Sequence, residues 1–197
     1  MCNGYLLPGE DGEYVAVDAP GGFAAWVQKT LPEGARLGHL LLTHQHFDHI
    51  QDAAALQEAT GCRVHACMPH SMGLTLAEHA LDWGIRPPEP FRVDDTLGEH
   101  DREATWAGLR WLALHVPGHS PDSMVYALPE QGLLFAGDVL FSGSIGRTDL
   151  PGGSMASLVR GIRSKLMSLP PDTEVYPGHG PATSIQEEAL NNPFIQG

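Results

Sequence analysis

Four side chains of the types that bind transition metals occur within six residues of this sequence. They lie in the stretch Thr43-His44-Gln45-His46-Phe47-Asp48-His49, which follows the apolar residues 40–42. Imidazole nitrogens and carboxylate oxygens are ligands of zinc and other borderline metals. His44 and His46 can point to the same side of an extended segment, whereas Asp48 and His49 follow as the chain enters a predicted helix. Because one ion cannot easily take all four ligands from so short a loop, this spacing favours two adjacent metals over a solvated histidine-rich loop.

Three more residues of the same types follow predicted strands later in the chain. They are His119 in Val116-Pro-Gly-His-Ser, Asp138 in Phe135-Ala-Gly-Asp and His179 in Tyr176-Pro-Gly-His-Gly-Pro. A glycine directly precedes each of them and lets the backbone turn or approach closely. Each residue alone is a weak signal, but together with residues 44–49 they predict one metal centre assembled from four separate segments.

The elements that must position these residues are short strands and helices mixed along the chain. Runs rich in β-branched and aromatic residues predict strands at Tyr14–Asp18, Leu40–Thr43, Arg63–Ala66, Gly108–Val116, Met124–Leu128, Leu133–Ala136 and Glu174–Tyr176. Amphipathic spacing predicts helices at Gly22–Thr30, His49–Thr60, Ser154–Ser168 and Ile185–Asn191, and Gly61 is a stop signal. The order predicts a layered α/β fold in a single domain, residues 1–197, since no linker is visible.

Composition limits the possible partners. The chain has a net charge of −13, a pI near 5.1 and as many histidines, 11, as lysines and arginines together. Such a balance argues against binding to nucleic acid or to an anionic membrane. No apolar run approaches 18 residues and no signal peptide is visible, so we expect a cytoplasmic protein. The three cysteines, Cys2, Cys62 and Cys67, contain no CxxC pair, so they are interpreted as buried or incidental thiols.

The ordered motifs THxHxDH, GHS, GD and GHG resemble those of the metallo-β-lactamase superfamily, across nearly the whole chain. The resemblance implies an αββα sandwich, in which two mixed β-sheets pack face to face with helices on their outer faces. It further implies two groups of metal ligands with a shared carboxylate. The first metal would be held by His44, His46 and His119, the second by Asp48, His49 and His179, and Asp138 would bridge them together with a water or hydroxide.

Finer motifs are similar to those of the glyoxalase II-type group, the hydroxyacylglutathione hydrolases and their short bacterial relatives. These motifs are residues 141–153, residues 177–183 and Asn192-Pro-Phe. The resemblance implies hydrolysis of a small, anionic thioester such as S-lactoylglutathione by a metal-bridging hydroxide, with Asp48 and Asp138 in catalytic roles. It implies two divalent ions, zinc first, with iron or manganese as alternatives. Arg147 matches a basic residue near the glutathione, while Asp149 replaces a family aromatic. The family's C-terminal glutathione-binding helices are not expected, because the chain stops at Gly197.

Other activities on the same scaffold remain open. A persulfide dioxygenase would use one iron held by residues corresponding to His44, His119 and Asp138. A lactonase or another ester hydrolase would use the same site as the thioesterase. A metal-binding module without activity is the non-enzymatic alternative, and the complete ligand set argues against it. The sequence leaves the oligomeric state open.

Overall fold

The computed structural model describes residues 2–82 and 84–196. The chain forms two compact units, the first with residues Cys2–Gly98 and Thr105–Leu109, the second with residues Glu99–Ala104 and those from Arg110 onward. Two large mixed sheets and several helices confirm the α/β class expected from the sequence. None of the helices in the described part of the chain is long and apolar enough to cross a bilayer.

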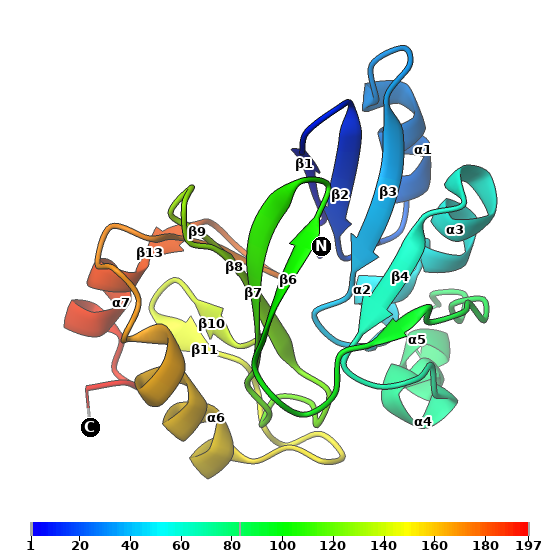
Figure 1. Ribbon diagram of the computed structural model, residues 1–197. Helices are drawn as coiled ribbons and strands as arrows, with labels where there is room; N and C mark the ends of the chain where they lie inside the picture. The colour runs from blue at the N-terminus through cyan, green and yellow to red at the C-terminus, as the bar shows by residue number, and fades with distance from the viewer. Residues whose placement is uncertain (1, 83, 197) are drawn as a thin grey trace. The chain divides into compact units, whose positions relative to one another are not determined.

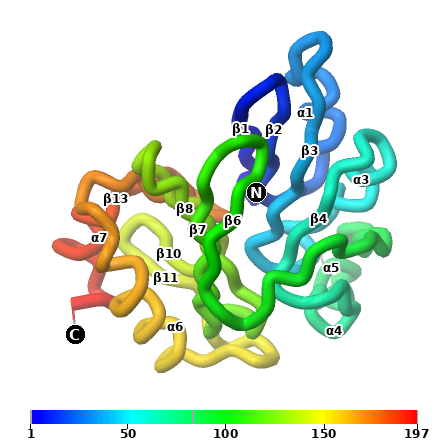
Figure 2. The backbone as a smooth tube through the Cα atoms, viewed as in Figure 1, coloured from blue at the N-terminus to red at the C-terminus, as the bar shows by residue number. Residues whose placement is uncertain are grey.

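The first unit is built on a five-stranded sheet in the order β1-β2-β3-β4-β5 (Figure 1). Its strands are β1 (Tyr5–Pro8), β2 (Glu13–Val17), β3 (Arg36–Leu41), β4 (Arg63–Ala66) and β5 (Asp95–Thr96). Its helices are α1 (Phe23–Thr30), α2 (Phe47–Ile50), α3 (Ala53–Thr60), α4 (Met72–Thr75) and α5 (Ala77–Asp82). Only β1 runs antiparallel to its neighbour, so the carboxyl ends of β2, β3 and β4 meet at one edge. Between β4 and β5 the chain passes through α4 and α5 (Figure 2).

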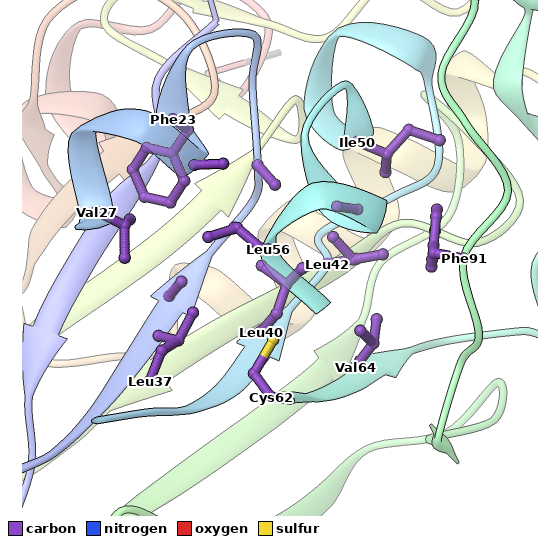
Figure 3. Packing of buried hydrophobic residues seen from close by; sticks show 14 of the residues in the cluster. Phe23, Val27, Leu37, Leu40, Leu42, Ile50, Leu56, Cys62, Val64 and Phe91 are labelled. Carbon is purple, nitrogen blue, oxygen red and sulfur yellow. The ribbon is translucent and has the colours of Figure 1, made fainter. Parts of the chain in front are cut away.

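Helices α1 and α3 cover one face of this sheet and enclose an apolar core (Figure 3). Phe23 and Val27 of α1 pack with Leu56 of α3 onto Leu40 and Val64 of the strands, and all five are buried. Helix α3 ends at Gly61, as the sequence predicts. The φ of Gly61 is 68°, and its N–H bonds the carbonyl of Gln57.

The single helix predicted at His49–Thr60 is wrong, because the structure divides this segment into α2 and α3. The break lies at Asp52, whose backbone and side chain both bond to other segments. Its N–H donates to the carbonyl of Ala19 at 2.8 Å, and its Oδ2 accepts the N–H of Ala24 at 2.9 Å. These two bonds hold the backbone out of helical continuity, although the apolar spacing runs through the break.

The second unit contains most of a six-stranded sheet in the order β13-β12-β9-β8-β7-β6 and the small hairpin β10-β11 (Figure 1). The end of β6 and the start of β7, within Thr105–Leu109, belong to the first unit. The strands are β6 (Arg102–Trp106), β7 (Leu109–His115), β8 (Met124–Leu128), β9 (Leu133–Gly137), β10 (Leu140–Phe141), β11 (Ser144–Ile145), β12 (Glu174–Pro177) and β13 (Thr183–Ser184). Strands β9 and β12 run parallel, so residues that follow them emerge at the same edge. A buried cluster with members such as Val125, Leu134 and Leu158 forms its core.

The helices of the second unit are α6 (Met155–Gly161) and α7 (Ile185–Asn191). Ser154 caps α6 by accepting the N–H of Ser157. The helix predicted at Ser154–Ser168 is therefore present, but its second half, Ile162–Leu166, is π-helical. There the N–H of Met167 bonds the carbonyl five residues earlier, at Ile162.

Two histidines lie on the face of the first sheet opposite to α1 and α3. Nδ1 of His39 on β3 and Nε2 of His65 on β4 are 2.9 Å apart, and the ring of Trp106 lies 4.9 Å from that of His65. Carboxylates lie at both ends of the pair: Asp95 Oδ2 is 3.3 Å from His65, and Glu13 Oε2 is 4.0 Å from His39. The hydrogen bond between the two rings needs a lone pair on one of the two nitrogens. At most one of the two histidines can therefore be positively charged while this bond is present.

Burial and the neighbouring His39 lower the pKa of His65 to about 4, against the opposing effect of Asp95. Burial also lowers the pKa of His39, with Arg63 and Arg36 acting in the same direction and Glu13 against it. In the unfolded chain these histidines have a pKa of about 6.5. The unfolded state therefore binds more protons between pH 6.5 and 4, and stability falls as the pH falls through this window.

We predict that the free energy of unfolding at pH 5 is about 1–2 kcal/mol lower than at pH 7 because of His65. Urea unfolding of the protein and of a His65→Gln variant at both pH values measures this loss. The variant is expected to lose less stability on acidification than the parent. Equal pH dependence of the two proteins would contradict the assignment.

Candidate metal centre

The buried carboxylate of Asp18 organises residues 43–49 of the first unit. This segment contains four of the predicted metal ligands and is called the metal-ligand loop. Asp18 directly follows β2 with a φ of 57° and is almost completely buried. Its Oδ1 accepts the Thr43 N–H at 2.8 Å, and its Oδ2 accepts the Thr43 hydroxyl at 2.7 Å. The same Oδ2 lies 2.8 Å from Nδ1 of His49. Asp18 thus holds both ends of the loop that contains the predicted ligands.

Hydrogen bonds to Asp18, direct for His49 and through Thr43 for His44, determine which ring nitrogen of each histidine carries the proton. An ionised carboxylate only accepts hydrogen bonds, so Nδ1 of His49 carries the proton and Nε2 carries the lone pair. Thr43 donates its one hydroxyl proton to Asp18 and therefore accepts from Nδ1 of His44 at 3.1 Å. This bond leaves the lone pair of His44 on Nε2. An outer nitrogen held by an acceptor and an inner nitrogen with a lone pair are typical of metal-ligating histidines.

The four predicted ligands of the first unit lie close together. Nε2 of His44 is 3.0 Å from Nδ1 of His46, and Oδ2 of Asp48 is 3.9 Å from Nε2 of His49. The three imidazoles are almost completely buried, whereas the Asp48 side chain is 32% exposed. This donor set of nitrogens and a carboxylate oxygen fits a divalent transition metal.

The residue between the first two ligands, Gln45, anchors the loop on its other side. Its Oε1 accepts the N–H of Ser71 and lies 3.1 Å from Nδ1 of His70, and its Nε2 donates to the carbonyls of Met68 and Pro69. Gln45 is completely buried. Alternation along the extended segment therefore places His44 and His46 on one side and this structural amide on the other.

In the second unit the three predicted ligands also lie together. Oδ2 of Asp138 lies 3.6 Å from Nε2 of His119 and 3.6 Å from Nε2 of His179. Nδ1 of His119 donates to the carbonyl of Arg147 at 2.9 Å, so its lone pair is on Nε2. A carboxylate oxygen at the same distance from two predicted ligand nitrogens is suited to share a metal with either of them.

Two glycines allow the close approach of backbones that this arrangement requires. At Gly118, with a φ of 138°, an added Cβ would lie 2.5 Å from the backbone nitrogen of Leu158. At Gly146 it would lie 1.9 Å from the carbonyl oxygen of Asp138. A side chain at either position would displace the segment that carries His119 or Asp138.

Arg147, the predicted substrate-binding residue, has its guanidinium on a neighbouring carboxylate. Its Nε and Nη2 each donate to Asp149 at 2.8 Å, and both side chains are exposed. The bond to Arg147 lowers the pKa of Asp149 to about 2. Asp149 stands where the resemblance leads us to expect an aromatic residue, and it pairs with the positive charge of the Arg147 side chain. The backbone carbonyl of Arg147 separately positions His119.

Cys2 lies beside two of the predicted ligands. One ligand atom each of Cys2, Asp48 and His49 lies within 4.8 Å of the others. Burial raises the pKa of this thiol to about 11. The interpretation of Cys62 and Cys67 as buried thiols is confirmed, whereas Cys2 has surroundings that the sequence analysis did not anticipate.

Asp18 was also missed, although a signal for it was present. It stands at the end of a predicted strand, and parallel strands deliver their carboxyl ends to the same edge as the ligand loop. Cys2 had no such signal, because β1 was not among the predicted strands.

The profile of a family described as the metallo-beta-lactamase superfamily matches residues 2–179. The chain belongs to the metallo-β-lactamase superfamily. Hydroxyacylglutathione hydrolase GloC of Haemophilus influenzae is 34% identical over 189 residues, which cover 94% of this chain and 89% of that protein. The match confirms the resemblance noted in the sequence and the expectation of an enzyme of the metallohydrolase class.

Solved structures show the same superfamily fold. The B3 metallo-beta-lactamase BLEG-1 matches with a TM-score of 0.88 and 34% identity, covering 100% of this chain and 95% of that one. The protein TTHA1623, in a di-iron-bound form, matches with a TM-score of 0.83 and 37% identity, covering 98% of this chain and 95% of that one. The metallo-β-lactamase fold is therefore confirmed, with two sheets and their helices.

We predict that Asp18→Asn weakens metal binding by about 10- to 100-fold, the usual cost of removing a group that orients a metal-ligating histidine. An amide in this place no longer fixes the proton on Nδ1 of His49. Competition with a chromophoric chelator measures the affinity. Asp52→Asn is the matched control, since Asp52 caps α1 and is expected to change stability alone. Equal losses in both variants would contradict the role of Asp18.

Proposed function

We propose that this chain is a dinuclear hydrolase of small thioesters, with S-lactoylglutathione as the first substrate to examine. One geometric observation carries the proposal: a single Asp138 oxygen lies 3.6 Å from the ligand nitrogens of both His119 and His179. This is the arrangement expected of a carboxylate shared by two ions. The 34% identity to hydroxyacylglutathione hydrolase GloC supports the choice of substrate class.

In this proposal the ligands of the two units act together. His44, His46 and His119 would hold one ion, Asp48, His49 and His179 would hold the other, and Asp138 would contribute to both. When bound, divalent ions supply a Lewis acid and a water of lowered pKa. Zinc is proposed first, and the di-iron form of TTHA1623 supports iron as an alternative.

The residues of the chain orient this chemistry. Asp18 and the Arg147 carbonyl hold the rings of His49 and His119 in the tautomers that present Nε2. Thr43 does the same for His44. Asp48 is partly exposed, so we propose that it also accepts a hydrogen bond from the attacking water and aligns it with the substrate carbonyl. No nucleophilic side chain is required, so no acyl-enzyme forms: water adds to the thioester carbonyl, the C–S bond of the adduct breaks, and the products are a carboxylate, a thiol and one proton.

A single domain over residues 1–197 and a cytoplasmic location both remain predictions.

The description of BLEG-1 as a B3 metallo-beta-lactamase makes a β-lactam the proper comparison substrate. A lactone and an uncharged ester separate thioester preference from general ester hydrolysis.

The decisive test combines metal analysis with substrate turnover. We expect about two divalent ions per chain and hydrolysis of S-lactoylglutathione that chelation abolishes and added metal restores. His119→Asn is expected to lower kcat/KM by more than about 100-fold, at least as much as loss of a supporting group does. His100→Asn, at an exposed histidine outside the ligand set, is the control. One iron per chain, with oxygen uptake on glutathione persulfide and no hydrolysis, would instead establish the dioxygenase.

We also predict that Asp149 weakens an interaction of Arg147 with anionic substrates. Asp149→Ala releases the guanidinium and is expected to lower KM by about 2- to 5-fold, the scale of an exposed ion pair. Arg147→Ala is expected to raise KM by a similar factor with little change in kcat. Steady-state kinetics with a charged and an uncharged thioester, at low and high salt, measure both effects. Identical changes with the uncharged thioester would refute an electrostatic role.

A further inference from the structure

The segment before β1 is held against the metal-ligand loop of the first unit. Strand β1 pairs antiparallel with β2 and places Tyr5 opposite Val17, so the residues before Tyr5 run alongside those after Val17. The approach is close: a Cβ at Gly4 would lie 2.7 Å from Pro20 and 2.9 Å from Phe23. The strand register therefore brings Cys2 to Asp18 and to the imidazole that Asp18 orients.

The ligand atoms at this point are of three kinds. A thiol sulfur of Cys2, a carboxylate oxygen of Asp48 and an imidazole nitrogen of His49 lie within 4.8 Å of one another. Ligand atoms around a tetrahedral zinc are separated by about 3.5 Å, since Zn–S is about 2.3 Å and Zn–N about 2.1 Å. The 4.8 Å limit is compatible with one shared ion if the partly exposed Cys2 and Asp48 side chains adjust while Asp18 holds the His49 ring in place. His49 is completely buried and Cys2 is half-buried, so solvent has limited access to both donors.

We propose that Cys2 is an additional metal ligand, and that its thiolate binds the ion held by Asp48 and His49. On binding, the S–H bond breaks, the proton leaves to solvent and a sulfur–metal bond forms, with no change in oxidation state. The proposal rests on the proposed function only in taking Asp48 and His49 as ligands of one ion. It adds a residue that lies outside the seven-ligand set and gives that ion a soft donor.

A thiolate ligand has consequences for metal preference. Sulfur favours zinc and cobalt over manganese and magnesium, which prefer oxygen ligands. Removing Cys2 is therefore expected to lower the affinity of one of the two sites for zinc by about 10- to 100-fold, while the affinity for manganese changes less.

Cobalt(II) substitution under anaerobic, reducing conditions tests the proposal without relying on activity. We expect a near-ultraviolet thiolate-to-cobalt charge-transfer band in the cobalt-loaded protein. Cys2→Ser is expected to lose this band and keep the visible d–d bands of bound cobalt. Cys62→Ala and Cys67→Ala are the controls: both thiols are buried, neither belongs to a group of potential metal ligands among the described residues, and both variants are expected to keep the band.

The outcomes separate this proposal from the proposed function. Visible cobalt bands without a charge-transfer band in the unaltered protein would show a metal centre that Cys2 does not ligate, which overturns only the proposal on Cys2. A charge-transfer band that survives in Cys2→Ser would do the same. Failure of the unaltered protein to bind cobalt or zinc would overturn both.

Discussion

The metal-ligand loop of the first unit depends on one buried charge, the carboxylate of Asp18. A buried ionised carboxylate is costly unless donors surround it, and here an amide, a hydroxyl and an imidazole fill that need. Each donor belongs to residues 43–49, so the requirement to solvate Asp18 is also the requirement that shapes the loop. If the loop moved, Asp18 would lose its partners inside the protein, and this couples ligand geometry to the stability of the fold.

In the second unit, a backbone carbonyl and closely approaching backbone segments position the predicted ligands, without a buried charge. Its His119 is oriented by a carbonyl, and the segments around Asp138 approach each other at glycines that tolerate no side chain. A carbonyl is a weaker acceptor than a carboxylate, but it is fixed by the chain itself and costs no buried charge. The guanidinium of Arg147 can consequently pair with Asp149 at the surface while its carbonyl remains committed to His119.

The sequence indicated candidate ligands within one loop or directly after predicted strands, and it missed residues whose role depends on pairing between strands. Residues 44–49 carry their ligand types within one loop, so composition and spacing were enough to predict them as ligands. Asp18 stands 25 residues before Thr43, and its role follows from the parallel pairing of β2 and β3. Cys2 required the antiparallel register of β1, a strand that its short, mixed sequence did not reveal. The helix at 49–60 was misjudged for a related reason, because Asp52 bonds to Ala19 and Ala24 in preference to helical partners.

These contacts imply that folding orients several predicted ligands of the dinuclear site before any ion binds. The outer nitrogens of His44, His49 and His119 are each held by an acceptor of their own unit, so folding alone orients these rings and ion binding needs no further rotation. Exposure divides the proposed ligands unequally. His44, His46 and His119 are buried, whereas Asp48 and His179 are each about one-third exposed. The buried side chains of His44, His46 and His119 would therefore release an ion more slowly than the partly exposed Asp48 and His179. A thiolate from Cys2 would strengthen binding of the ion that Asp48 would hold.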